Sequence, residues 1–178
     1  MTDAIVPDDK DWTWVLGRAC PDCGLDASAV DPTAVSAMVR ANAASWGLLL
    51  AAPAEEFRRR PAPDRWSTLE YAAHVRDVFR LFRARLVLML DENDPLFANW
   101  DQDETARAER YNEQDPASVS SELVEAGAAL ADSFDTVRGE TWQRTGRRSD
   151  GATFTVESFA RYLIHDPVHH LWDVGHPI

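Results

Sequence analysis

Histidines are the residues of this chain with the clearest capacity for chemistry. Four of the five lie among the last 14 residues, and the fifth, His74, stands alone. His165 and His169 are four residues apart, so on a helix both rings project from one face and can bind one metal ion at ~2.0–2.1 Å. An imidazole from a facing helix would complete three ligands, and His74 is placed to supply it. Three protein ligands leave a position for water or substrate, which is typical of catalytic metal sites.

Two carboxylates are candidates to support these ligands. Asp173 follows His169 by four residues, and Asp77 follows His74 by three. On a helix these spacings place each carboxylate beside its histidine, where it can hold the ring through the second nitrogen. We therefore expect Asp77 and Asp173 to orient the rings of the metal ligands.

The C-terminal histidine motif has two complications and one simpler explanation. His170 lies about 100° around a helix from His169, so the two rings are not expected to share an ion. Pro167 removes a backbone donor and predicts a kink, or a new helix that starts at Asp166. The simpler explanation is that the histidines are hydrogen-bonded core residues that bind no metal.

The chain has two cysteines, Cys20 and Cys23, in the run Cys20-Pro21-Asp22-Cys23-Gly24. The pair could be half of a zinc knuckle, but a closed site needs two more ligands, and His176 is an unsupported candidate for one of them. A redox pair of the thioredoxin type needs a strand–helix context that the surrounding sequence lacks. An ordinary loop with reduced thiols is the default prediction.

Helix start signals indicate the elements that position these residues. Asp-Pro pairs at residues 31–32 and 115–116, and a capping box at residues 67–70, each mark the start of a helix. The sequence predicts helices over residues 31–50, 67–89 and 115–137, a last helix from about residue 155, and a turn at 146–151. The acidic segment 92–115 is long for a loop, so it is either a functional loop or carries a short helix.

These elements predict one all-α domain. Residues 31–178 form a four-helix bundle with a long crossover between the second and third helices, and no set of alternating strands is evident. Residues 1–30 are expected to form an irregular N-terminal arm that packs on the bundle through Trp12 and Trp14.

The composition and net charge of the chain indicate which classes of binding partner are unfavourable. Of the 178 residues, 18 are basic and 30 acidic, a net charge of −12 that disfavours nucleic acid and anionic membranes. No apolar run approaches the ~18 residues of a membrane span, and residues 1–10 lack the pattern of a signal peptide, so we expect a cytoplasmic protein. No glycine-rich phosphate loop or dinucleotide fingerprint appears. The clusters Arg58–Arg60 and Arg147–Arg148 are either solvated surface or docking points for anionic groups of a substrate.

The motifs together resemble a known family. They are the run Trp66-Ser67-x-x-Glu70, the run His74-Val75-Arg76-Asp77, and the pair His165-x-x-x-His169 about 90 residues later. Over residues 32 to 174 the chain is similar to the DinB-like superfamily, which includes thiol-dependent S-transferases and mycothiol-dependent maleylpyruvate isomerases. The resemblance implies a zinc or nickel ion held by His74, His165 and His169, and a low-molecular-weight thiol such as mycothiol as a co-substrate. Pro167 within the motif and the arm with its two cysteines depart from the family pattern.

Two main functional hypotheses follow. The first is a metal-dependent enzyme that activates a thiol or water for transfer, isomerisation or hydrolysis of a small-molecule substrate. The second is a non-enzymatic, stress-related bundle that binds metal or a small ligand. An interaction module with histidines in its core is a third hypothesis, and a homodimer is plausible for this kind of bundle.

Overall fold

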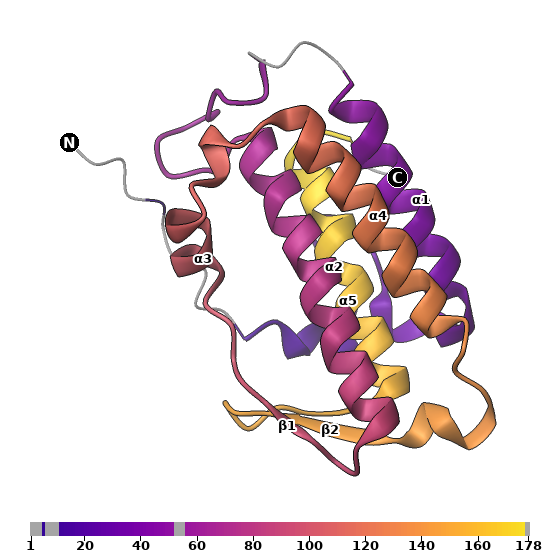
Figure 1. The fold of residues 1–178 in the computed structure, drawn as a ribbon. Coiled ribbons are helices and arrows are strands. Elements are labelled where there is room, and N and C mark those ends of the chain that lie inside the picture. Colours follow the sequence, from indigo (N-terminus) through magenta and orange to yellow (C-terminus); the bar gives the residue numbers. More distant parts are fainter. Residues whose placement is uncertain (1–4, 6–10, 52–55, 177–178) are drawn as a thin grey trace.

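The structure, a computed structural model, describes residue 5 and residues 11–51 and 56–176. Its four long helices run along one another as a bundle (Figure 1). They are α1 (Val35–Leu49), α2 (Thr68–Asp91), α4 (Pro116–Phe134) and α5 (Val156–Asp173). The predicted four-helix bundle with a long crossover between its second and third helices is confirmed.

The helices begin where side chains satisfy their first backbone N–H groups. Ser67 forms the predicted capping box with Glu70 at the start of α2, and Asp115 accepts a hydrogen bond from the Ser118 amide ahead of α4. Thr155 forms an equivalent box at the start of α5. The Asp31 cap differs from the prediction, because it starts a short 3-10 helix, η3 (Pro32–Ala34), and the α-helix begins at Val35.

The core lies between the four helices and determines how closely they approach. Trp46, Phe79 and Phe159 are each at most 1% exposed. A Cβ atom built on Gly127 of α4 would lie 2.7 Å from the Cβ atom of Ala43 on α1, a contact that real side chains do not make. Helices α1 and α4 therefore cross at a distance that only glycine allows at this position.

The crossover between α2 and α4 carries its own structure. It contains the two-residue strand β1 (Leu96–Phe97), the short helix α3 (Gln102–Ala108) and the 3-10 helix η5 (Tyr111–Glu113). The alternative with a short helix is thus the one the structure adopts, and α3 lies beside the bundle (Figure 1).

Three short strands lie across one end of the bundle, where no strand was expected (Figure 1). Strand β2 (Thr145–Arg148) pairs in parallel with β1 and antiparallel with β3 (Thr153–Thr155). The predicted turn at 146–151 is therefore partly strand. These strands have two to four residues, which is too short to show an alternating pattern in the sequence. For this reason the sequence did not predict the sheet.

The arm packs on α5 through two 3-10 helices, η1 (Trp12–Leu16) and η2 (Ala27–Ala29). The Arg161 side chain of α5 donates to the Val30 carbonyl at 2.9 Å, which fixes the end of the arm. The residues 1–10 used for the signal-peptide argument lie, except residue 5, outside the described residues. Within the described ranges, no helix combines the length and apolar character needed to cross a bilayer.

Candidate metal centre

Helix α5 runs without a break through Pro167, so the predicted restart at Asp166 does not occur. The carbonyl of Pro167 accepts a hydrogen bond from the buried Asn42 side chain at 2.8 Å. Residues 165 to 170 therefore follow one helical wheel. On it, His165 and His169 share one face, while Asp166 and His170 share another about 100° away.

The face with Asp166 and His170 meets His74 of α2. The Nε2 atom of His74 lies 3.5 Å from Asp166 Oδ2, and the Nε2 atom of His170 lies 3.7 Å from the same oxygen. One donor atom from each residue lies within 4.8 Å of the other two. We call these three residues the pocket group. Two imidazoles and one carboxylate are a donor set that suits a divalent ion with coordination positions left open.

Neighbouring groups hold the pocket group in place. Asp173 Oδ2 accepts a hydrogen bond from His170 Nδ1 at 2.8 Å, which keeps the proton on Nδ1 and the lone pair of Nε2 directed toward Asp166. The His74 ring stacks on Trp100, with ring centroids 5.3 Å apart and planes 7° from parallel. His74 Nδ1 and Asp166 Oδ1 are buried without a hydrogen-bond partner, so this group has unused polar capacity of the kind a metal or ordered ligand satisfies.

The charge state of the carboxylate also fits a metal ligand. Burial alone would raise the pKa of Asp166, but the neighbouring His170 and His74 rings outweigh it and lower this pKa to about 2. At neutral pH Asp166 is therefore an anion, the form that binds a cation.

An open pocket is lined by Asp166 and His170 of this group, and also by His165 and His169 on the neighbouring face of α5. Its open volume, including the solvent at its mouth, is about 710 Å³. Its walls include Phe82, Trp100 and Tyr162, together with the basic side chains of Arg85 and Arg148.

Arg85 is the unusual residue of this pocket. Its side chain is 5% exposed, and its Nη2 atom donates to the Ala98 carbonyl at 2.7 Å, yet its buried Nε atom has no hydrogen-bond partner. Burial, with a smaller effect from the nearby Arg148, lowers the pKa of Arg85 to about 10, so the group is still a cation at neutral pH. A buried cation with a spare donor fits a carboxylate or another anionic group of a ligand.

The other face of α5 meets the arm. Donor atoms of Cys20, Cys23, His165 and His169 all lie within 4.8 Å of one another, and Cys20 Sγ is 3.6 Å from His169 Nδ1. We call these four residues the arm group. Burial, followed by the charge of His169, lowers the pKa of His165 to about 4, and burial likewise lowers the pKa of His169. Both rings are therefore neutral at neutral pH.

The three histidines predicted to share one ion are thus divided between two groups: His74 belongs to the pocket group, whereas His165 and His169 belong to the arm group. The reason is the rotation of α5, which turns Asp166 and His170 toward α2. Sequence reasoning did not name either residue as a candidate ligand, although their spacing of four residues was visible in the sequence. His176, considered as a partner for the cysteines, is in neither group.

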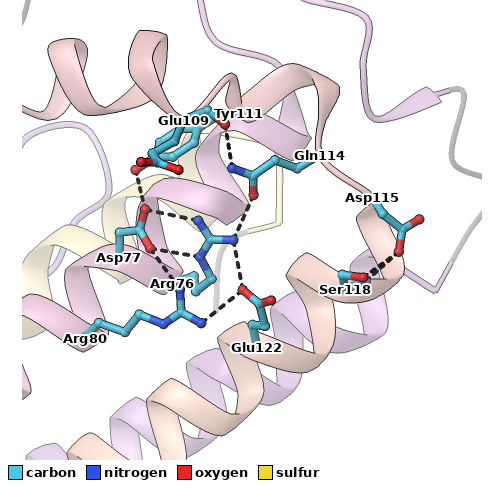
Figure 2. A network of polar contacts seen from close by, with 9 residues as sticks. All are labelled: Arg76, Asp77, Arg80, Glu109, Tyr111, Gln114, Asp115, Ser118 and Glu122. Atoms are coloured by element: carbon cyan, nitrogen blue, oxygen red, sulfur yellow. Dashed lines mark hydrogen bonds and ion pairs between the residues drawn. The ribbon is translucent and has the colours of Figure 1, made fainter.

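The two supporting carboxylates also differ in their roles. Asp77 lies in the network of Figure 2, where Arg76 binds it at 2.9 Å and the Tyr111 hydroxyl donates to it at 2.6 Å. It therefore ties the crossover to α2, and its hydrogen-bond and ion-pair partners are Arg76, Arg80 and Tyr111 rather than His74. Asp173 does support a histidine, but that histidine is His170, and Asp173 lies 3.9 Å from the Nε2 atom of His169.

The two arginine clusters also differ in their roles. Arg58 donates to the backbone of Asn112 and so ties the connector before α2 to the crossover, whereas Arg60 pairs with Glu70 and ties the connector to the first turn of α2. Arg148 lines the pocket and is held by Asp150.

Comparisons with known proteins agree with this architecture. The family model described as DinB superfamily matches residues 37–174. A similar solved structure is that of YfiT from Bacillus subtilis, described as a probable metal-dependent hydrolase with an unusual four-helix bundle topology. Its TM-score is 0.64 at 15% identity, and the match covers 96% of this chain and 90% of that chain. At this identity the likeness shows a shared fold. No curated protein gives a significant match.

Proposed function

The chain belongs to the DinB superfamily, and from this premise we propose that it is a metal-dependent enzyme acting on a small molecule. The ion, zinc or nickel by our expectation, is held by His74, Asp166 and His170. The observation that carries the proposal is that three donor atoms from two helices converge beside an open pocket. A site for purely structural metal would have four protein ligands and no open coordination position.

Each residue around the site has a task in this proposal. A bound divalent ion would supply a nucleophile at neutral pH by lowering the pKa of water or a thiol. Asp173 keeps His170 in the tautomer that exposes Nε2. Trp100 covers the His74 ring and lines the pocket, which limits the water that reaches the reacting atoms. Arg85 positions an anionic group of the substrate.

The nucleophile defines two versions of the proposal. Water would make the protein a hydrolase, which is the activity ascribed to YfiT. A low-molecular-weight thiol such as mycothiol would make it an S-transferase or isomerase, as the resemblance of the motifs implies. In both versions Arg85 and Arg148 favour a substrate with a carboxylate or a similar anionic group.

A metal- or ligand-binding protein without turnover is the second candidate function. It is favoured if the pocket group binds metal but no panel of substrates is converted. We further propose that the partners are small molecules rather than nucleic acid or membranes, because the net charge is −12. A cytoplasmic location stays a prediction, and so does a homodimer. Light scattering that shows only monomer would contradict the homodimer prediction.

The test is metal content and turnover of protein purified without a nickel column. We expect Asp166→Ala and His170→Ala to lose the pocket ion and to lose turnover of esters, amides or thiol–electrophile pairs. His176→Ala is the matched control, because that exposed histidine belongs to neither group. Metal content and turnover that survive both pocket variants would overturn the proposal.

A further inference from the structure

We propose that the arm group is a second metal site, a structural zinc centre of two cysteines and two histidines that clamps the N-terminal arm onto α5. Its ligands are Cys20, Cys23, His165 and His169. This inference is independent of the pocket group, with which it shares no residue.

The observed spacing matches tetrahedral zinc. A sulfur at ~2.3 Å and a nitrogen at ~2.0–2.1 Å from one tetrahedral ion are about 3.5–3.6 Å apart. Cys20 Sγ and His169 Nδ1 are 3.6 Å apart. That distance is long for a strong hydrogen bond from a thiol but is the separation that a shared ion requires. One donor atom from each of the four residues lies within 4.8 Å of the other three, so small rotations of the side chains bring all four to one ion.

A buried nitrogen atom of the arm group that lacks a hydrogen-bond partner also favours a bound ion. His165 is 4% exposed, and its Nε2 atom is buried without a hydrogen-bond partner. Leaving such an atom unpaired destabilises the fold, and a bound ion would satisfy it.

The cysteine loop has the conformation of a preformed chelate. The Gly24 amide donates to the Cys20 carbonyl at 3.0 Å, and the Cys20 amide donates to the Leu25 carbonyl at 2.9 Å. Gly24 has φ +77°, a left-handed conformation that favours glycine. The turn thereby brings Cys23 back toward Cys20.

The ligand set indicates a structural role. Two thiolates and two imidazoles complete a tetrahedral shell and leave no position for substrate. The Trp12 ring packs against the His165 and His169 rings, with centroids 5.4 and 5.3 Å away, and so covers the cluster. Two ligands come from the arm and two from α5, so an ion here joins segments 149 residues apart at Cys20 and His169.

Cobalt substitution tests the site, because a thiolate bound to Co²⁺ gives sulfur-to-metal charge-transfer absorption that the pocket group cannot give. We expect Co²⁺ added to the reduced, metal-free wild-type chain to produce this absorption, saturating at one equivalent and removed by Zn²⁺. Cys23→Ser should abolish it. His170→Ala, which alters the pocket group alone, and Asp22→Asn, an exposed change within the same loop, should both retain it.

A measurement on the unmodified chain guards against a variant that fails to fold. Titration of the wild-type zinc protein with an organic mercurial should release one zinc for the two thiols that react, as read by a zinc-sensitive dye. Absence of the thiolate–cobalt absorption at saturating Co²⁺, its persistence in Cys23→Ser, or a mercurial titration that releases no zinc would each overturn the proposal. Loss of the pocket ion would leave all three readings unchanged, so the two proposals fail separately.

Discussion

Replacement of Asp173 by asparagine separates the roles of the two faces of α5. The Asp173 side chain is 11% exposed, and its carboxylate can only accept the hydrogen bond from His170 Nδ1 at 2.8 Å. Asparagine has the same size but can present an N–H group to Nδ1. This favours the tautomer with its proton on Nε2, the atom that faces Asp166.

The distances from Asp173 to His170 and to His169 set the expected loss of metal affinity at each group. Loss of a group that orients a metal-binding imidazole typically costs about 10–100-fold in affinity, or roughly 1.4–2.7 kcal/mol. We expect this loss at the pocket group. At the arm group the effect should be less than about tenfold, because Asp173 lies 3.9 Å from His169 Nε2, beyond the ~3.2 Å limit of a normal hydrogen bond.

Competition with a chromophoric chelator measures both affinities in one sample. Cobalt bound at the arm group is identified by its thiolate absorption, and cobalt at the pocket group by the remainder. The matched control is Asp77→Asn, the carboxylate expected from sequence to support His74. It binds Arg76 and Tyr111 instead (Figure 2), so both metal affinities should stay unchanged. The free energy of unfolding should fall by about 1.5–3 kcal/mol, because hydrogen bonds to a charged group are lost.

Two results would refute this reasoning. One is a loss of pocket affinity in Asp77→Asn as large as that in Asp173→Asn, which would place the supporting carboxylate where the sequence suggested. The other is an Asp173→Asn variant that weakens only the cobalt with thiolate absorption, which would mean that Asp173 supports the ligands of the arm group.

Two further predictions concern packing and the substrate. Gly127→Ala should lower the free energy of unfolding by about 1–2 kcal/mol in thermal melts, because the clash with Ala43 costs ~1–3 kcal/mol and helix propensity returns up to ~1. Gly47→Ala is the control and should be neutral or stabilising, because its Cβ would meet only side-chain atoms of α4, at 3.2 Å or more. Equal melting temperatures for the two variants would contradict the packing argument. Arg85→Met should raise KM for a carboxylate substrate about 10–100-fold, since a hydrogen bond to a charged group contributes ~1.5–3 kcal/mol, and an unchanged KM in steady-state kinetics would remove the anion-binding role.

The helices were predictable because their start signals are local. The boxes and caps at Ser67 and Asp115 act within three residues, so sequence alone places the starts of α2 and α4. The Asp31 cap was located correctly but misread, because a side chain that accepts from the Thr33 amide can start a 3-10 turn as well as an α-helix. The strands at the end of the bundle depend on pairing between distant segments, such as Leu96 with Arg147, and have no local signal.

The sequence predicted which helices carry the candidate metal ligands, but not which of their residues come together. The sequence contains two equally spaced pairs, His165 with His169 and Asp166 with His170, and a helical wheel separates them by about 100°. Which pair faces His74 depends on the rotation of α5, a result of packing along the whole helix that no local motif encodes. Counting imidazoles alone favoured the face with His165 and His169, because it gave no weight to a carboxylate that is ionised at neutral pH.

The same rotation explains why the cysteines first looked isolated. Once Asp166 and His170 face α2, His165 and His169 must face a flank about 100° around the helix, where the arm with Cys20 passes. Consecutive residues of one rigid helix therefore serve both groups, and a one-residue slip in the rotation of α5 would disrupt both at once. A ligand that ties the arm to this helix resists such a slip, so an ion at the arm group would help to hold Asp166 and His170 at the angle that the pocket requires.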